Sequence, residues 1–446
     1  MNKIISRLGI DKAIRYVILG KGISVLSGLI IMLLISAYMS KEAQGYYYTF
    51  NSVVALQIIF ELGLSTVIIQ FASHEMSGMK YDTIEKKITG DEHNKQRYLS
   101  LFNLALKWYG AIGLLIVCVV GPAGYYFFSH GNSSDINWEG PWMVLTLSTA
   151  INVFLISVLS IAEGSGLVVS VNKMRMLQAL LAAVLSAILL LVGEGLYATS
   201  ALAISGTIIF SLFSYKYFKS VHSQAKRQKE LKDAKSISWR KEILPMQWRI
   251  ALSWMAGYFI FFIMTPIAFK YFGATYAGQL GMSLTLCNMV MATGLAWIST
   301  KYPSWGVMIS KGERANIDKS FYSATIQSIC FVLFALISAL GCLLLFRYYN
   351  FSFVERFLDL KSFIYLSLAI VGNHLVACLA TYIRAHKTEK MTATSCVMAV
   401  LTVITMLMVA YNKESSLYVM VYALIVWVYF VPQTYFIFKK FKRNYE

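Results

Sequence analysis

Apolar residues occur in long runs along the whole chain, separated by short polar stretches. A run of about 18 or more apolar residues is long enough to cross a bilayer as a helix. We predict twelve spans, at about 13–39, 46–72, 99–128, 141–162, 176–193, 196–219, 250–272, 277–300, 321–346, 362–384, 391–410 and 416–439. The pattern therefore predicts an all-α polytopic membrane protein.

The longest loop divides these spans into six and six. It contains "KRQKELKDAKSISWRKE", and we predict an N-terminal six-helix lobe at 1–219, a basic cytoplasmic linker at 220–249 and a C-terminal six-helix lobe at 250–446. The segment "SKEAQGYYYTFNSVVALQIIFELGLS" is faintly similar to "GATYAGQLGMSLTLCNMVMATGLAWIS" at the same place in the second half. Because each half has an even number of spans, the repeat is parallel. The lobes would be related by a pseudo-two-fold along the membrane normal.

The distribution of positive charge predicts the orientation in the membrane. Of the 40 Lys and Arg residues, 32 fall on one side of the predicted spans and six on the other. By the positive-inside rule both termini are cytoplasmic. The net charge of +18 is explained by cations that lie beside the lipid headgroups at the cytoplasmic surface. We therefore expect membrane lipids, and no nucleic acid, as partners.

The sequence lacks the residue patterns that metal binding, ATP hydrolysis and external catalysis require. The six cysteines all fall inside predicted spans, and no Cys/His spacing is typical of a metal site. There is no Walker A motif for ATP hydrolysis. The predicted external loops near 129–141 and 347–361 are too short for a catalytic domain. We therefore expect no catalytic residue, no metal and no cofactor, and do not expect an enzyme.

One carboxylate interrupts the second span. Glu61 lies in "ALQIIFELGLS", and a charge at the bilayer centre costs about 2.5 to 3.5 kcal/mol. At helical spacing Tyr47, Gln57, Glu61 and Ser65 share one face, which is typical of a helix that lines a cavity or a bundle interior. Two interpretations stay open: a protonatable group that couples transport to H+ or Na+, or a buried structural partner of a lysine or of polar groups.

Two lysines lie inside spans of the first half. Lys21 and Lys107 are each about eight residues from the cytoplasmic end of a span, or roughly 12 Å deep. Lys107 shares a face with Ser100, Asn103 and Gly110. They would form a positive pocket for a phosphate-bearing substrate, with Asn103 as a polar contact. Alternatively, they reach the headgroups by snorkelling, or one of them pairs with the carboxylate of the second span.

The second half offers fewer polar candidates. Arg249 and Lys270 lie near the ends of the seventh span and would add cations to the substrate path, or Arg249 would serve only as an interfacial anchor. His374 lies within the tenth span, where it would relay protons or hydrogen-bond within the bundle. Pro266 interrupts the seventh span and is a candidate hinge for gating.

Two segments resemble a known family. "SKEAQGYYYTFNSVVALQIIFELGLSTVIIQFASHE" resembles the first two-span region of bacterial O-antigen flippases, and "AEGSGLVVSVNKMRMLQALLAAVLS" is similar to the same group. These flippases form the polysaccharide transport branch of the multidrug/oligosaccharidyl-lipid/polysaccharide (MOP) exporter superfamily. The twelve-span plan agrees over the whole chain, whereas the local similarity is confined to the first 220 residues or so.

The resemblance implies a function in lipopolysaccharide biosynthesis. The expected substrate is an undecaprenyl-pyrophosphate-linked O-antigen repeat unit, moved by alternating access from the cytoplasmic to the periplasmic leaflet of the bacterial inner membrane. Cations of the cavity would meet the pyrophosphate, and other membrane proteins of polysaccharide assembly would be partners. One alternative is an ion-coupled multidrug or small-molecule exporter of the same superfamily. A second is an oligosaccharide polymerase or ligase, which would need a larger external loop.

Overall fold

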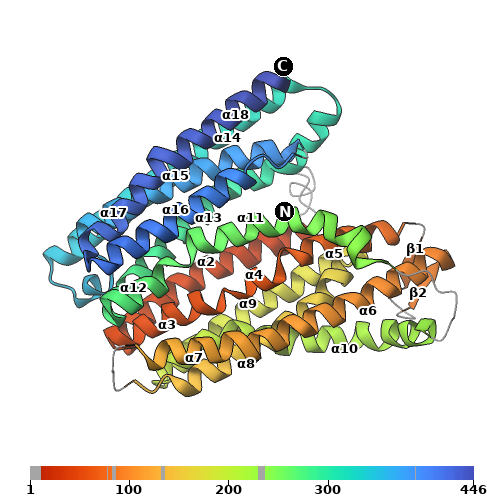
Figure 1. Ribbon diagram of the computed structural model, residues 1–446, viewed down its shortest axis with the longest axis horizontal. Helices are drawn as coiled ribbons and strands as arrows, with labels where there is room; N and C mark the ends of the chain where they lie inside the picture. The colour runs from red at the N-terminus through yellow and green to blue at the C-terminus, as the bar shows by residue number, and fades with distance from the viewer. Residues whose placement is uncertain are drawn as a thin grey trace. The chain divides into compact units, whose positions relative to one another are not determined.

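The fold is given by a computed structural model, which describes residues 12–77, 79–82, 87–131, 136–229, 237–386 and 388–445. The chain forms two compact helical units (Figure 1). The first comprises Met1–Met39 and Val53–Trp254, and the second comprises Ser40–Ser52 and Met255–Glu446. The segment 40–52, which the division by sequence places in the first lobe, packs with the second unit.

The first unit is a helical bundle with its largest core around α8. α8 contacts α5, α6 and α10, and α9 packs against α2 and α10. The elements of this unit are α2 (Lys12–Tyr38), α4 (Gln57–Glu61), α5 (Leu64–Glu75), β1 (Met79–Asp82), β2 (Lys87–Gly90), α6 (Glu92–Leu115), the π-helix η1 (Ile116–Val120), α7 (Gly121–Ser129), α8 (Glu139–Gly164), α9 (Val168–Leu191), the 3₁₀ helix η2 (Gly195–Ser200), α10 (Ala201–Lys229) and the π-helix η3 (Trp239–Ile243).

The second unit is a bundle around α13 and α15. α13 packs against α12, α14 and α15, and α15 also contacts α17 and α18. Its elements are α12 (Met264–Phe272), α13 (Ala274–Ser310), α14 (Arg314–Tyr348), the 3₁₀ helix η4 (Ser352–Arg356), α15 (Leu360–Ala385), α16 (Thr392–Tyr411), α17 (Ser415–Ile425), the π-helix η5 (Val426–Phe430) and α18 (Val431–Tyr445). Two helices, α3 (Lys41–Val54) and α11 (Leu244–Phe261), run from one unit into the other.

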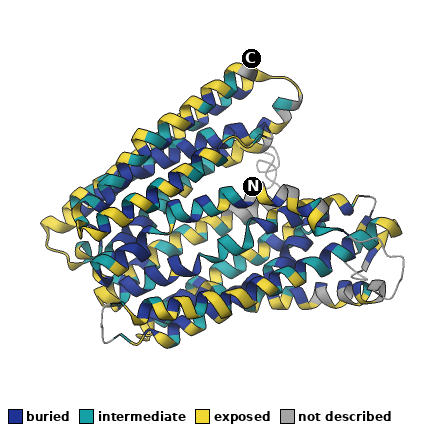
Figure 2. Cartoon of the chain, viewed as in Figure 1, coloured by how far each residue is buried: buried dark blue, intermediate teal, exposed yellow. Residues whose placement is uncertain are grey.

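The helices are long and apolar enough to confirm the predicted number of spans. Within the described residues, eleven helical segments could cross a membrane, and the bent pair Lys41–Glu61 and Leu64–Glu75 makes twelve. Exposed positions recur along the helices of both units (Figure 2). Many of them carry large apolar side chains, such as Leu26 on α2 and Phe334 on α14. Such side chains suit a surface solvated by lipid rather than water. The all-α polytopic fold class is thus confirmed.

Local sequence explains where several helices begin and deform. The Asp91 carboxylate caps α6 by accepting a hydrogen bond of 3.0 Å from the Asn94 backbone N–H. The π-helices η1 and η5 end two residues before Pro122 and Pro432, respectively. A proline lacks the N–H and its ring clashes with the carbonyl four residues earlier, and the wider π turn relieves that clash.

A β-hairpin follows the second span. β1 and β2 pair antiparallel, with Met79 opposite Gly90, and the hairpin contacts α6 and α10 through β2. Met79 and Ile88 are buried in the core of the first unit. The sequence indicates only a charged loop here, because four-residue strands are too short to show a period.

The two segments that the sequence relates as a repeat pack against each other in the second unit. A Cβ added to Gly45 of α3 would lie 2.0 Å from the Ala274 carbonyl oxygen at the start of α13. The Gln44 amide donates hydrogen bonds of 2.9 Å to the Gly278 carbonyl and 3.0 Å to the Arg356 carbonyl. Glycine is therefore required at position 45 for the backbones to approach this closely.

Candidate functional site

The second predicted span is broken beside its carboxylate. α4 ends at Glu61, and the next two residues, Leu62 and Gly63, are left-handed with φ of 53° and 66°. α5 then continues the span at a bend of 41°. A left-handed leucine costs roughly 1 to 2 kcal/mol, and a break at membrane depth is tolerated where the backbone is buried in protein or lines a cavity. Strain of this kind points to a functional position.

Glu61 has a tyrosine as its partner. The Tyr109 hydroxyl of α6 donates a hydrogen bond of 3.0 Å to Glu61 Oε1. Tyr109 is completely buried, whereas Glu61 is half-buried. In the described part of the chain neither Lys21 nor Lys107 bonds to this carboxylate. The polar partner that Glu61 finds on a neighbouring span is therefore Tyr109 and not a lysine.

A second acceptor lies one turn before Glu61. Gln57 and Glu61 are four residues apart on α4 and so share a face. The Gln57 side-chain oxygen is buried and has no hydrogen-bond partner among the described residues. The end of α4 adds backbone carbonyls that the broken helix leaves without intrahelical partners. Together these are oxygen acceptors that suit a proton or a hard cation.

No cluster of three or more His, Cys, Asp or Glu side chains with metal-binding geometry occurs in the described ranges of the chain. A single carboxylate beside an amide oxygen is better suited to exchangeable binding of a proton or Na+ than to tight binding of a divalent ion.

The two candidate lysines of the first unit are exposed. Lys21 on α2 and Lys107 on α6 both present exposed side chains, and Asn103 on α6 is half-buried. Ser100, predicted on the same face, instead accepts a hydrogen bond of 3.1 Å from the Ile237 backbone N–H. The polar face of α6 is therefore covered at Ser100 and open at Lys107.

His374 lies in a buried contact of the second unit. It is completely buried on α15, with Nε2 2.8 Å from the Ser328 hydroxyl of α14. Ser328 Oγ donates to the Gly294 carbonyl of α13 at 2.6 Å. Nδ1 has no partner among the described residues. This geometry favours the hydrogen-bonded bundle histidine over the proton relay.

The other candidates of the second half lie near helix ends. Lys270 is exposed in the last turn of α12, with its ammonium 5.8 Å from the centroid of the Tyr271 ring. Pro266 is the third residue of α12, directly after the break at Phe262 and Ile263 that separates α11 from α12. Arg249 belongs to α11, but its side chain lies outside the described part of the structure. The break before Pro266 fits a bend, and the hinge stays a prediction.

Sequence reasoning missed an ion-pair network that ties the end of the predicted linker, at η3, to α6 of the first unit. Arg97 on α6 donates to both oxygens of Glu75 at 3.0 and 3.1 Å and to Glu242 of η3 at 2.6 Å. Arg97 holds the pKa of the Glu242 carboxyl below its ordinary value of 4.5. Trp239 of η3 stacks on Trp108 of α6, with ring centroids 4.3 Å apart. The contact of η3 with α6 could not be predicted from sequence, because basic and acidic residues simply alternate in the loop that contains η3.

Comparison with known proteins identifies the fold. No protein-family model matches the chain, and no curated protein matches it in sequence. The lipid II flippase MurJ in an inward closed conformation is similar in structure, with a TM-score of 0.62, 13% identity and coverage of 96% of this chain and 87% of that chain. The MATE multidrug transporter DinF-BH gives a TM-score of 0.61 at 13% identity, covering 98% of this chain and 95% of that chain.

A MOP superfamily transporter from Pyrococcus furiosus has a TM-score of 0.54 at 16% identity, covering 98% of this chain and 96% of that chain. All of these similarities are below 25% identity and concern the fold. The chain therefore shares the multi-pass fold of these transporters, and its membership of the superfamily stays a prediction. The O-antigen flippase branch stays a prediction.

Proposed function

We propose that the protein flips an undecaprenyl-pyrophosphate-linked O-antigen repeat unit from the cytoplasmic to the periplasmic leaflet of the bacterial inner membrane. The observation that carries this proposal is the exposure of Lys21 and Lys107 within membrane spans. An exposed charge at this depth is stable only beside water, headgroups or a counter-charge. Two cations on the first unit would meet the pyrophosphate and acidic sugars of such a substrate.

The transport step requires no covalent chemistry. Phosphates and sugar hydroxyls cannot cross hydrocarbon unaided, because each loses its hydrogen bonds to water. A polar surface with a few cations lowers this barrier. We propose that H+ or Na+ binds at Glu61 and Gln57, where acceptor oxygens meet a strained break in the span. One charge moved across the membrane potential supplies about 2.3 kcal/mol per 100 mV.

An ion-coupled exporter of small molecules is the second candidate. A single carboxylate with an unpartnered amide oxygen nearby would also suit an exchanger that binds a proton or a cationic compound. Structural similarity supports both candidates, since the neighbours include MurJ and DinF-BH. The charge of the span residues distinguishes them: two exposed lysines favour an anionic substrate.

A rescue assay for surface O-antigen tests the proposal. A strain that lacks its own flippase and makes the matching repeat unit receives wild type, Lys107→Ala or Glu61→Gln at equal membrane levels. Lys173→Ala is the matched control, because Lys173 is also exposed on the first unit but lies in the first turns of α9. We expect wild type and the control to restore surface polysaccharide, and Lys107→Ala and Glu61→Gln to leave the lipid-linked unit on the cytoplasmic face.

The assay has two contrary outcomes. If wild type fails with its matching repeat unit, the flippase proposal is wrong, and export of cationic compounds becomes the function to measure. If wild type succeeds and Lys107→Ala behaves like Lys173→Ala, the flippase proposal stands without a role for Lys107.

A further inference from the structure

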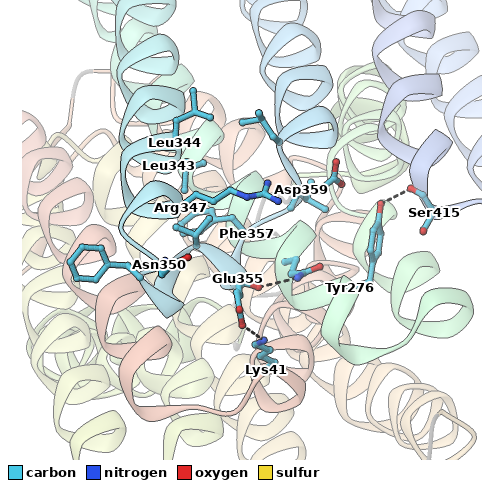
Figure 3. Close-up of a pocket in the computed structure, with 15 residues that line it drawn as sticks. Lys41, Tyr276, Leu343, Leu344, Arg347, Asn350, Glu355, Phe357, Asp359 and Ser415 are labelled. Carbon is cyan, nitrogen blue, oxygen red and sulfur yellow. Dashed lines mark hydrogen bonds and ion pairs between the residues drawn. The ribbon is translucent and has the colours of Figure 1, made fainter.

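A pocket lies at one end of the second unit. It has a volume of about 730 Å³, and it is formed by the ends of α13, α14, α15 and α17, the helix η4 and Lys41 of α3 (Figure 3). These are the ends of the spans that we predict to be external. Its lining combines apolar side chains such as Leu343 and Leu344 with polar and charged ones such as Arg347 and Asn350. This composition suits a ligand that is itself amphiphilic.

Most of the charges in this pocket have partners within the protein. Lys41 Nζ lies 2.5 Å from Glu355 Oε2, and the pairing lowers the pKa of the Glu355 carboxyl. Asp359 caps α15 by accepting a hydrogen bond of 3.2 Å from the Ser362 backbone N–H. Its negative charge is thus partly offset by the positive end of the α15 dipole. Neither carboxylate therefore leaves a full negative charge in the pocket.

Arg347 is the exception. Its guanidinium forms no hydrogen bond or ion pair with any residue that the structure describes. Figure 3 shows the side chain pointing across the pocket toward Asp359, with no bond joining the two. A guanidinium offers five N–H donors in a planar fork, which matches two oxygens of a phosphate. An unpaired arginine in a pocket of this size favours an anionic group as the missing partner.

The side chains around the pocket are of the kind expected at a membrane surface. Next to Arg347, Tyr348 is 80% exposed, Tyr349 68% and Phe351 56%. Aromatic side chains at the end of a span are typical of the interface between hydrocarbon and headgroups. Leu344 and Leu345, one turn deeper on α14, are also exposed and would contact acyl chains. The exposed leucines thus lie where the acyl chains of a lipid would be, and Arg347 lies where its headgroup would be.

We propose that this pocket holds the phosphate headgroup of a membrane lipid, with the phosphate on Arg347 and the rest of the headgroup toward Asn350. The site lies in the second unit, apart from Glu61 and the lysines of the first, and it does not rest on the proposed flippase function. It would anchor one lipid of the surrounding leaflet at the outer end of α14.

Native mass spectrometry of the purified full-length protein in detergent tests this assignment. The probes are phosphatidylglycerol, a diacylglycerol with the same acyl chains, and inorganic phosphate. The variants are Arg347→Gln, Arg347→Lys and the matched control Lys361→Gln, since Lys361 is exposed at the same end of the unit and does not line the pocket. Arg347 is exposed, so its replacement leaves the core intact.

We expect wild type to bind one phosphatidylglycerol more tightly than it binds diacylglycerol. Arg347→Gln should weaken this binding about tenfold or more, because a hydrogen-bonded charge is lost. Arg347→Lys should retain part of it, and Lys361→Gln should match wild type. Equal binding of diacylglycerol and phosphatidylglycerol, or equal binding by Arg347→Gln and wild type, would overturn the proposal. Inorganic phosphate binding as tightly as the lipid would overturn the lipid as the source of the phosphate.

Discussion

Replacing Gly45 by alanine perturbs the closest approach of two helices in the second unit. The new Cβ would lie 2.0 Å from the Ala274 carbonyl oxygen and 2.5 Å from its carbon. Both are backbone atoms, so no side chain can rotate away. α3 and α13 would have to separate locally by roughly 1.5 Å to restore ordinary van der Waals contact at about 3.5 Å.

The cost has two parts. Overpacking of a tight contact destabilises by about 1 to 3 kcal/mol. The separation would also stretch the 2.9 Å hydrogen bond from the Gln44 amide to the Gly278 carbonyl, leaving a nearly fully buried amide poorly paired for about 1 kcal/mol more. Alanine in place of a helical glycine gains about 1 kcal/mol in helix propensity, so we expect Gly45→Ala to lower the free energy of unfolding by about 2 kcal/mol net.

Unfolding in mixed micelles with sodium dodecyl sulfate measures this difference. Gly341→Ala is the matched control, because Gly341 lies in α14 of the same unit and a Cβ there would meet nothing within 4 Å. That substitution should be neutral or stabilising by up to about 1 kcal/mol through helix propensity. If the two variants unfold with the same free energy, the close approach of α3 and α13 is wrong.

Three other predictions concern named contacts. Glu242→Gln should lower the stability of the protein at pH 7, because Arg97 holds the pKa of the Glu242 carboxyl below 4.5. The stability that this pair contributes is lost as the pH falls through the lowered pKa, so the difference between wild type and variant should shrink in acid. Thermal unfolding at pH 7 and well below pH 4.5 measures that difference, and a difference that does not change with pH would contradict the prediction. Tyr109→Phe and Glu61→Ala should lose about 1 kcal/mol less stability together than the sum of their separate losses, since each removes the same hydrogen bond, and additive losses would refute the contact. His374→Gln should cost about 1 to 3 kcal/mol in unfolding yet retain transport in the rescue assay, whereas a proton relay at this histidine would require transport to be lost.

The spans and the main candidate could be found without a structure. The hydrophobic effect acts on apolar runs whose length matches the bilayer, so the number of spans follows from local composition. Glu61 stands out for the same reason, since a carboxylate in an apolar run is rare and costly. The predicted break in the seventh span follows from Pro266, because its ring excludes a normal helical turn before it.

Other features could not be read from local pattern. Helical periodicity indicates which residues share a face, but not which helix packs on that face. Hence the pairing of Glu61 with Tyr109, which are 48 residues apart, was not predicted, and a lysine was considered in its place. The left-handed conformation of Leu62 could not be predicted from sequence either, because leucine usually continues a helix. The strained conformation is maintained by the packing around it.

The sequence by itself determined an all-α membrane protein of twelve spans, with most of its cations at one membrane surface and few polar residues within the bilayer. Only the tertiary structure decided that the segment 40–52 packs with the second unit, that Arg97 ties the linker end to the first, and that Arg347 stands unpaired among the described residues of a pocket. The physical reason is that the free energy of inserting a helix into lipid depends on the composition of that segment alone. These contacts instead depend on how side chains from distant parts of the chain fit together in shape and charge.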